Sequence, residues 1–552
     1  MASNTAVHVP DGFRLHTENT SHILLDANEA FLNPVQEFNR DTSIACIRVW
    51  SEELNRTKEE RWNKSQQRKA AQKGSSASSK VPAAANIGTD ESERTPDISE
   101  STEVGGKKHE YRPYKITILE ALSATGLRSI RYAKEIPLVK YVIANDLSHG
   151  AIEAMKRNIS INGLGDGTLQ PSSNGASKQK IHLNEGDACS LMYNHREEKK
   201  RVDVVDLDPY GTAAPFIDAA VQCVTDGGLL CVTCTDLSVL ATTNYPEKCF
   251  SNYGGVPVKA EYCHESALRL VLHTLSTSAS RYGRYIEPLL CLSIDFYVRL
   301  FVCVRTAPVE VKKALSKNST FYICTTCQTH YEQPLGRMIT KTSTSGHTNY
   351  IFKTHPGPLV AGPMWSGRLH DPDFVGKVLA HIEENKSHYG TSSRMKGMLT
   401  VAKEELETPF FFTPSKVASF FHCETPSIDD VASALLNAGH RVSRSHACAG
   451  SLKTDASHRE LHDVFRCWIK THPVKMENIS ETSPARRLLA KEPLVEANFD
   501  RHPMTPGAQE TIRLVRYQEN PANWGPAKKA ATKPDLKRKR STEALDEPPA
   551  KH

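Results

Sequence analysis

The sequence lacks an uninterrupted apolar run of about 18 residues, the length that a transmembrane helix requires. Its first residues, Met1–Gly12, include Asp11 and lack the basic start and apolar stretch of a secretory signal. They also lack the Arg-rich amphipathic pattern of a mitochondrial presequence. We therefore expect neither a membrane span nor secretion.

A strong charge imbalance is also missing. The net charge of +6 over 552 residues permits a polyanionic partner without requiring one. The 14 cysteines are scattered, and Cys231, Cys291 and Cys303 lie in apolar runs. Without a secretory signal, such cysteines are typical of reduced core thiols in an intracellular protein.

Two segments have almost no large apolar residues, so they cannot bury enough surface to offset the entropy lost on ordering. They are 63–110, predicted to be a disordered insertion, and 526–552, predicted to be a disordered basic tail. Gly165–Lys180 is predicted to be an inserted loop. The remaining boundaries that we predict are 1–62 for an N-terminal part of a catalytic domain, 111–308 for its core, 309–408 for a connecting region and 409–500 for a smaller C-terminal α/β domain.

Between these segments, β-rich runs alternate with helical patterns. The predicted strands are Lys115–Ala121, Tyr141–Asp146, Ile181–Glu185, Val202–Asp208, Gly228–Thr235, Pro288–Ser293 and Phe296–Arg305. The predicted helices are Leu127–Glu135, His149–Ile161, Pro215–Thr225 and Ala260–Arg281, followed in the C-terminal domain by Ile428–Ala438 and Arg459–Thr471. This alternation predicts a doubly wound parallel sheet. Only Ile294 and Asp295 separate the last two strands of the core, so these must form an antiparallel hairpin. Such a Rossmann-like sheet is typical of class I methyltransferases.

Acidic residues follow three successive strands, at the edge where doubly wound sheets bind ligands. The loop from Glu120 to Arg128 has one glycine, whereas a dinucleotide fingerprint has three. Asp146 can accept both ribose hydroxyls of a nucleoside. Asp187, followed by Ala188, is suitably placed for an adenine amino group. Three acids at one sheet edge favour a nucleoside cofactor over ordinary strand-to-helix turns.

The fourth strand ends in Asp208-Pro209-Tyr210, which resembles the Asp/Asn-Pro-Pro-Tyr element of amino-group methyltransferases. The lone pair of an exocyclic amine is delocalised into its ring, which makes the amine a poor nucleophile. A carboxylate that accepts its N–H groups restores nucleophilicity and takes the departing proton. Pro209 fixes the backbone, and Tyr210 offers a ring for base stacking. The alternative is a plain turn, because Asp-Pro is a common turn dipeptide.

A cysteine mechanism is the competing interpretation. RNA carbon-5 methyltransferases attack the base with the cysteine of a Pro-Cys pair, where this chain has Pro209-Tyr210. Cys231 and Cys234 are therefore better interpreted as core residues of a strand.

Taken together, the motifs make the chain similar to the eukaryotic type of tRNA (guanine-26, N2) dimethyltransferase. The matching stretches are 31–41, 121–128, 144–148, 206–211, 215–219, 229–236, 262–265, 286–290, 362–367 and 369–371. The resemblance covers nearly everything from about 30 to 490 except the two insertions. It implies S-adenosylmethionine as the cofactor, tRNA as the partner, and methylation of a guanosine 2-amino group.

The resemblance also implies roles for matching positions. Arg40 and Arg128 would contact the cofactor, together with Asp146, Asp187 and Ala188, although surface or ion-paired arginines remain the alternative for the first two. The catalytic residues would be Asp208, Pro209 and Tyr210. For the substrate we assign Phe31, and in the C-terminal domain Arg441, Arg444 and Lys453, which surround a predicted β-turn and could contact phosphates.

Three hypotheses remain open. The first is a tRNA methyltransferase, and the second is an amino-group methyltransferase acting on DNA adenine or a protein amide, since Asp208-Pro209-Tyr210 alone does not choose the acceptor. A tRNA-binding folding factor without activity is a third possibility, which the intact acidic residues argue against. No segment indicates an obligate protein partner.

Cys324 and Cys327 form one CxxC pair, which is half of a zinc site. The further ligands on offer, His330, His347 and His355, are irregularly spaced, so we predict no metal. The basic run Lys537–Arg540 favours nuclear localisation over a merely solvated tail. A mitochondrial pool remains an alternative.

Overall fold

The computed structural model describes residues 8–26, 32–75, 110–165, 179–343, 346, 348–354, 364–481 and 483–505. The predicted loop 165–180 falls almost entirely outside these ranges, and the predicted tail lies wholly outside them, as do Phe31, His347 and His355.

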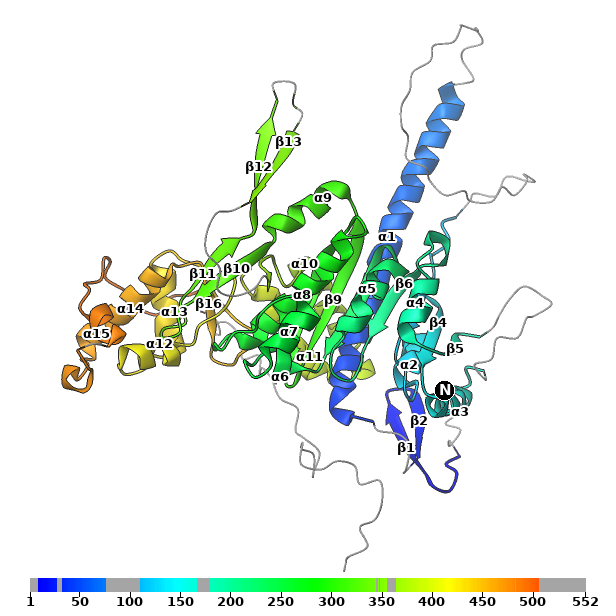
Figure 1. Ribbon diagram of the computed structural model, residues 1–552. Helices are drawn as coiled ribbons and strands as arrows, with labels where there is room; N and C mark the ends of the chain where they lie inside the picture. The colour runs from blue at the N-terminus through cyan, green and yellow to red at the C-terminus, as the bar shows by residue number, and fades with distance from the viewer. Residues whose placement is uncertain are drawn as a thin grey trace, which may run out of the picture.

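A seven-stranded sheet forms the centre of the molecule (Figure 1). Its strands are β3 (Ile116–Glu120), β4 (Val139–Asp146), β5 (Ile181–Glu185), β6 (Val202–Leu207), β7 (Val224–Cys234), β8 (Arg284–Ile294) and β9 (Tyr297–Thr306). Their order is β5-β4-β3-β6-β7-β9-β8. The first five pair in parallel, and β9 runs antiparallel to both β7 and β8. The predicted parallel sheet with a terminal hairpin is therefore confirmed.

Helices cover both faces of this sheet, because its strands carry apolar side chains on both sides. The helices of the core are α2 (Leu127–Glu135), α3 (His149–Ile161), α4 (Ala188–Asn194), α5 (Ala214–Cys223), α6 (Leu237–Leu240), α7 (Pro246–Tyr253) and α8 (Cys263–Ser280). Val205 packs in the cluster that includes Ile217 of α5 and Leu270 of α8. Its neighbour Val204 packs in the opposite cluster, with Ile130 of α2. Successive residues of one strand therefore pack into hydrophobic clusters on opposite faces of the sheet.

The second face is completed by elements from both ends of the core. These are α1 (Glu37–Ser75), α10 (Pro372–Glu384) and α11 (Ser392–Glu404), while β1 (Phe13–Glu18) and β2 (Ser21–Asp26) form a hairpin against α2 and α3. Ile47 of α1, Val375 of α10 and Met395 of α11 belong to one buried cluster with the sheet. The predicted connecting region therefore contributes helices to the catalytic core.

Helix α1 corrects the predicted start of the disordered insertion at residue 63, because the helix continues to Ser75. Its last turns are rich in Lys, Gln, Ala and Arg, residue types that favour helix. Extending a helix that is already nucleated costs little, and Ile44 and Trp50 anchor the beginning of this one in the core. Residues 76–109 of the predicted insertion lie outside the described residues.

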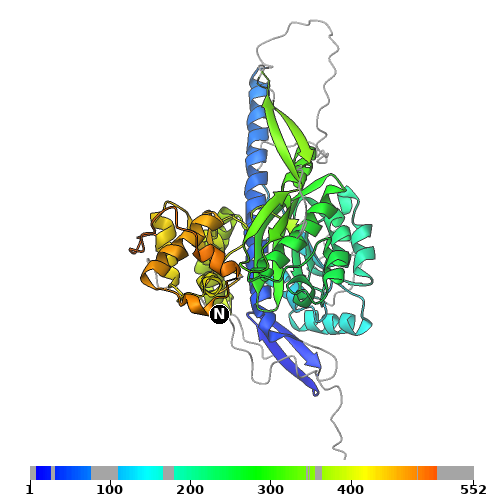
Figure 2. The ribbon, with the colours of Figure 1, turned by 60° about the vertical axis from the view of Figure 1, so that its left-hand side comes forward.

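After β9 come α9 (Pro308–Lys313) and a set of short strands: β10 (Asn318–Ile323), β11 (His330–Pro334), β12 (Gly336–Thr342), β13 (Thr348–Thr354) and β14 (Met364–Trp365). The C-terminal lobe contains α12 (Pro414–Phe421), α13 (Ile428–Asn437), β15 (Val442–Arg444), β16 (Leu452–Thr454), α14 (His458–Thr471) and α15 (Pro484–Leu489). Its helices gather beside the catalytic part (Figure 2). They enclose a cluster of their own that includes Phe421, Leu435 and Phe465.

Candidate active site

The acidic residues singled out in the sequence meet at one edge of the sheet. Glu120 pairs in register with Ala144 of β4 and Asp206 of β6, and Asp146 pairs with Glu185 of β5. Parallel strands place all their carboxyl ends at the same edge, where doubly wound sheets bind ligands. Asp146, Asp187 and Asp208 follow directly from these strand ends.

Asp146 shapes the loop that follows β3. One carboxylate oxygen accepts a hydrogen bond from the backbone N–H of Ala124 at 2.9 Å, and the other accepts from that of Ser148 at 2.9 Å. Ala124 and Gly126 both have positive φ, 45° and 76°. A Cβ atom on Gly126 would lie 2.9 Å from Met155 Cγ, so the single glycine is required both by its backbone conformation and by helix packing. The carboxylate keeps lone pairs for further donors.

Asp187 is the N-cap of α4. Its side chain accepts a hydrogen bond from the backbone N–H of Ser190 at 2.7 Å, which lowers the pKa of the carboxyl. Ala188 is buried at the start of the helix. Asp187 therefore has a structural partner, and contact with an adenine remains a prediction.

Asp208 is held by a buried arginine. Its carboxylate accepts a short hydrogen bond from the Arg128 guanidinium, and the Asp208 side chain is 14% exposed. Arg128 also lies 3.6 Å from Asp206 and 3.8 Å from Glu120, and donates to Ser43 Oγ at 3.2 Å. A contact of Arg128 with the cofactor remains a prediction. These contacts make it a positioning residue for Asp208.

Beneath Asp208 lies a charge network that the sequence analysis missed. Arg299 of β9 donates to Asp206 at 2.8 Å, and Tyr132 donates to the other Asp206 oxygen at 2.5 Å. Burial alone would raise the pKa of Asp206, but Arg299 and Arg128 hold it below its usual value. For Glu120, burial dominates and raises the pKa to about 8. The available sequence signal was a charged residue inside an apolar strand run, as at Asp206 and Arg299.

Pro209 and Tyr210 stand on a firmly fixed turn. The Gly211 N–H donates to Thr235 Oγ1 at 2.7 Å, and the Thr235 N–H donates to the Gly211 carbonyl at 2.8 Å. Thr212 is bonded to the Tyr253 hydroxyl at 2.6 Å, which in turn donates to Asp236 at 2.9 Å. The Tyr210 ring remains 82% exposed and available for stacking.

Two other predicted residues are paired inside the protein. Arg40 is 5% exposed, and its guanidinium donates to both carboxylate oxygens of Glu18, which joins α1 to the hairpin β1–β2. The cofactor contact predicted for Arg40 therefore remains a prediction. Lys453 is 1% exposed, and its ammonium lies 3.1 Å from Glu265 and 3.0 Å from Glu405. A lysine buried in this way cannot meet a phosphate, so its predicted role in tRNA binding is wrong.

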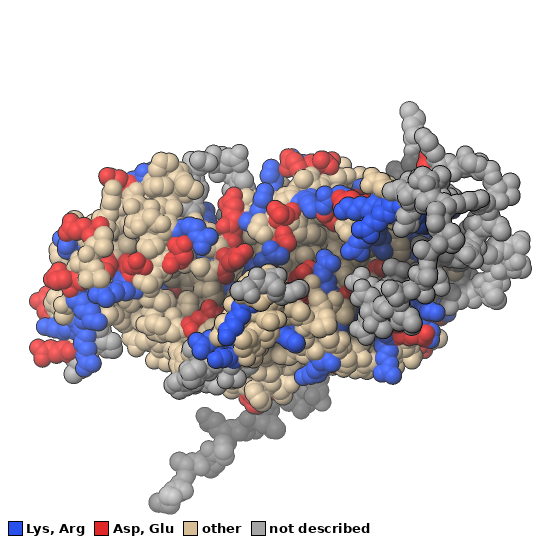
Figure 3. Space-filling model, turned by 90° about the horizontal axis from the view of Figure 1, so that it is seen from above, with Lys and Arg blue, Asp and Glu red and all other residues tan. Residues whose placement is uncertain are grey.

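Arg441 and Arg444 differ from Lys453. The Arg441 side chain is 71% exposed and pairs with Asp455 at 2.8 Å, while Arg444 is partly buried at the end of β15. On the face seen from above, Lys and Arg are mixed with Asp and Glu (Figure 3). The face in that view is therefore not uniformly basic.

The CxxC pair lies in the turn between β10 and β11. The Cys324 N–H donates to the Thr329 carbonyl at 2.9 Å, and the Cys327 thiol donates to Thr329 Oγ1 at 3.1 Å. His347 and His355 are not among the described residues. The absence of zinc therefore remains a prediction.

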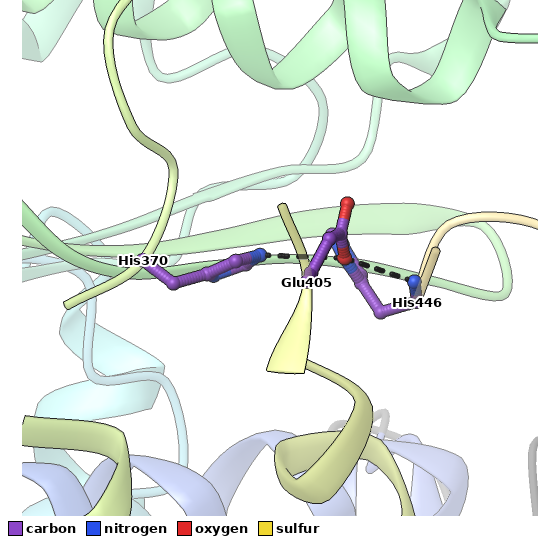
Figure 4. Close-up of side chains that lie close together, drawn as sticks. All are labelled: His370, Glu405 and His446. Carbon is purple, nitrogen blue, oxygen red and sulfur yellow. Dashed lines mark hydrogen bonds and ion pairs between the residues drawn. The ribbon is translucent and has the colours of Figure 1, made fainter. Parts of the chain in front are cut away.

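One buried group has the composition of a metal site: His370, Glu405 and His446, whose ligand atoms lie within 4.8 Å of one another (Figure 4). The Ser293 N–H donates to His446 Nε2 at 3.2 Å, so the ring proton is on Nδ1, which donates to Glu405 at 2.6 Å. The Glu405 carboxylate therefore accepts the His446 Nδ1–H and also contacts the Lys453 ammonium. These contacts favour a hydrogen-bonded charge cluster over a metal site.

This cluster joins the two lobes. Glu405 follows α11, His446 and Lys453 lie in the C-terminal lobe, and Glu265 lies in α8 of the catalytic part. Burial alone would raise the pKa of Glu405, but Lys453 and His446 hold it well below its usual value. The charges are thus paired where the lobes meet.

The carboxyl-edge acids, the Asp208-Pro209-Tyr210 turn and the strand order define a class I amino-group methyltransferase. The family model of N2,N2-dimethylguanosine tRNA methyltransferases matches residues 12–466. The chain belongs to this family. None of the helices in the described ranges is long and apolar enough to cross a bilayer.

Similar proteins come from fungi and archaea. The chain is 42% identical to the tRNA (guanine(26)-N(2))-dimethyltransferase of Schizosaccharomyces pombe, covering 91% of this chain and 90% of that one. It is 39% identical to the mitochondrial tRNA (guanine(26)-N(2))-dimethyltransferase of Saccharomyces cerevisiae, covering 94% and 92%. The solved complex of Trm1 from Pyrococcus horikoshii with S-adenosyl-L-methionine has a TM-score of 0.61 at 24% identity, covering 82% and 99%, and confirms the predicted fold.

The carboxyl edge fits S-adenosylmethionine. Asp146 has acceptor capacity for two ribose hydroxyls, and Leu147 beside it is 74% exposed, an apolar surface that a flat adenine could cover. The fixed loop from Ser123 to Gly126 leaves a defined backbone facing the same edge. When bound, the cofactor supplies an electrophilic methyl group.

Proposed function

We propose that this protein transfers methyl groups from S-adenosylmethionine to the 2-amino group of a guanosine in tRNA, at position 26, giving N2-methyl- and N2,N2-dimethylguanosine. The observation that carries the proposal is the Asp208 carboxylate, held by Arg128 at the sheet edge beside the exposed Tyr210. The family membership supports tRNA as the acceptor.

In this mechanism the chain positions the amine and removes its proton. The contact with Arg128 orients the Asp208 carboxylate, so its free oxygen accepts the N–H of the guanine 2-amino group and then takes the proton. The Pro209 carbonyl accepts the second N–H, and Tyr210 stacks on the base. A guanosine inside folded tRNA must leave its stack to reach this edge, so the base is flipped out.

The acceptor class is tested by labelled methyl transfer. Wild-type protein should label tRNA and should not label tRNA carrying adenosine at position 26, DNA or protein. Nucleoside mass spectrometry of the product should show N2-methyl- and N2,N2-dimethylguanosine. Label in DNA adenine or in a protein amide would favour the alternative amino acceptors, and binding of tRNA without label would favour a folding factor.

Asp146→Ala should weaken cofactor binding, because it removes two charge-assisted hydrogen bonds to the ribose, worth about 1.5–3 kcal/mol each. Titration calorimetry with S-adenosylmethionine measures the change. Glu185→Ala is the matched control, since Glu185 is an exposed carboxylate on the neighbouring strand and pairs with the exposed His149 at 3.0 Å. Equal dissociation constants for the two variants would remove Asp146 from the cofactor site.

We propose Arg441 and Arg444 as contacts to tRNA phosphates. The exposure of Arg441 supports this role, and the Asp455 partner would be exchanged for a phosphate. Arg441→Glu with Arg444→Glu should raise the Michaelis constant for tRNA and flatten its salt dependence, with unchanged cofactor affinity. An unaltered salt titration would place phosphate binding elsewhere.

We further propose a nuclear location, on the basic run Lys537–Arg540, with a second pool in mitochondria. The mitochondrial name of the Saccharomyces cerevisiae relative supports the second pool. Imaging of the tagged chain with and without residues 537–540 tests the nuclear signal.

A further inference from the structure

A cavity of about 350 Å³ lies where the catalytic part meets the C-terminal lobe. We call it the junction pocket. It is lined by Tyr262 before α8, by His330 and Tyr331 at the start of β11, and by Thr408, Phe410 and His458 around the C-terminal lobe. Its volume falls within the range of small-molecule sites, about 300–1,000 Å³.

Aromatic rings form the walls of the junction pocket. The Tyr262 and Phe410 rings stack with centroids 4.4 Å apart. The His330 ring meets Phe410 edge-on at 4.7 Å and His458 at 4.9 Å. Tyr331 is 65% exposed, although it also lines the pocket. These planar surfaces suit a flat aromatic ligand.

Two buried polar atoms lie in the lining of the junction pocket. His330 Nδ1 and Thr408 Oγ1 are buried and have no hydrogen-bond partner in the described part of the chain. Buried polar groups are almost always satisfied, so such atoms point to a missing ligand. Burial, with a contribution from His458, lowers the pKa of His330 to about 3. The neutral ring and the hydroxyl can both donate and accept, as the edge of a nucleobase requires.

The topology places the junction pocket at the edge that carries Asp208. Strand β7 ends at the carboxyl edge, and β8 runs parallel to it because both are antiparallel to β9. Helix α8 joins these two strands, so it begins at the carboxyl edge, and Tyr262 is its N-cap. A substrate bound at Asp208 can therefore extend to the junction pocket along one side of the molecule.

We propose that the junction pocket binds a second unstacked nucleobase of the tRNA, distinct from the guanosine that is methylated. Proteins read unpaired RNA by stacking bases on aromatic rings and hydrogen-bonding their edges. Lys416 lines the pocket and exposed Arg459 follows His458, so cations are available for the adjoining phosphates. The proposal rests on the proposed function and explains how the cost of flipping the target guanosine is offset.

The test compares two pocket variants with a matched control. Tyr331→Ala removes an exposed ring, and Thr408→Val removes a hydroxyl without changing its shape. Tyr350→Ala removes an equally large exposed ring from β13, outside the pocket lining. Electrophoretic mobility shift gives the dissociation constant for tRNA, with S-adenosylmethionine affinity and melting temperature measured alongside.

Both pocket variants should raise the dissociation constant for tRNA, Tyr331→Ala by about tenfold as for the loss of one stacked base. Tyr350→Ala should change it less than twofold, and cofactor affinity should be unaltered in all three. Ultraviolet cross-linking of the wild-type complex should join a nucleotide other than the target guanosine to the peptide containing Tyr331.

Two failures are distinguishable. If wild-type protein does not methylate tRNA, the proposed function fails. If it does, but Tyr331→Ala matches Tyr350→Ala and Thr408→Val changes only the melting temperature, the pocket holds water and the inference is overturned. Cross-linking of the target guanosine itself to the Tyr331 peptide would overturn it equally.

Discussion

Asp208→Ala will lower the rate of methyl transfer by about 10²–10⁴-fold, the usual contribution of a general base, while the affinity for S-adenosylmethionine stays within threefold. The reason is geometric: the carboxylate addresses the amine of the substrate, and the cofactor contacts are assigned to other strand ends. Arg128 keeps Glu120 and Asp206 as neighbours, so its charge remains compensated when Asp208 is removed. Single-turnover methylation of tRNA and calorimetry measure the two quantities.

Asp226→Ala is the control for this variant. Asp226 lies near the start of β7, at the opposite edge of the sheet, where it accepts the Thr306 N–H. Asp208→Asn keeps the shape of the side chain and removes its charge. The amide oxygen can still accept one N–H, but the amide cannot take the proton. More than a tenth of the wild-type rate in Asp208→Ala would remove Asp208 from the chemistry.

The second large effect concerns stability. Glu405→Ala should lower the free energy of unfolding by about 3–5 kcal/mol, as expected when one partner of a buried ion pair is removed. Lys453, almost fully buried, would keep only one of its two carboxylate partners, Glu265, and the buried His446 Nδ1–H would lose its acceptor. Urea unfolding followed by tryptophan fluorescence measures the change.

Asp455→Ala is the matched comparison. It breaks an ion pair of similar length with Arg441, but the arginine is 71% exposed, so about 0–1 kcal/mol is expected. Similar losses in the two variants would show that burial adds nothing at Glu405, contrary to the prediction.

The stability that Glu405 contributes should also depend on pH. The pKa of Glu405 in the folded protein lies well below the usual value. Its contribution to the free energy of unfolding is therefore complete above the unfolded pKa of about 4.3 and is lost as pH falls toward the folded pKa. The gap between wild type and Glu405→Gln should therefore be constant from pH 7 to 5 and narrow below about 4.3. A gap that widens on acidification would contradict this sign.

The sequence was informative where local pattern and global packing agree. Apolar runs such as Val202–Leu207 form the strands, and Asp146 and Asp208 stand at one edge because parallel strands end together. The prediction was wrong where it relied on amino-acid composition alone. Residues 63–75 were predicted to be disordered because they contain few large apolar residues, yet they continue α1 from an anchored start.

Charged residues within the core were the hardest to interpret. The Asp206–Arg299 pair spans β7, which lies between their strands, and joins positions far apart in the chain. Lys453 stands beside a turn and was assigned to phosphate binding, but Glu265 and Glu405 enclose it. No local pattern distinguishes a solvated lysine from a paired, buried one.

By itself, the sequence determined the strands of a parallel, doubly wound sheet, the terminal hairpin and the acidic residues at the carboxyl edge of the sheet, because periodicity and loop length act over a few residues. Only the tertiary structure decided that Arg128 holds Asp208, that Lys453 is buried and that aromatic rings from four segments line the junction pocket. These features depend on contacts between distant segments, and the free energy of such contacts comes from burial that exists only once the chain has folded.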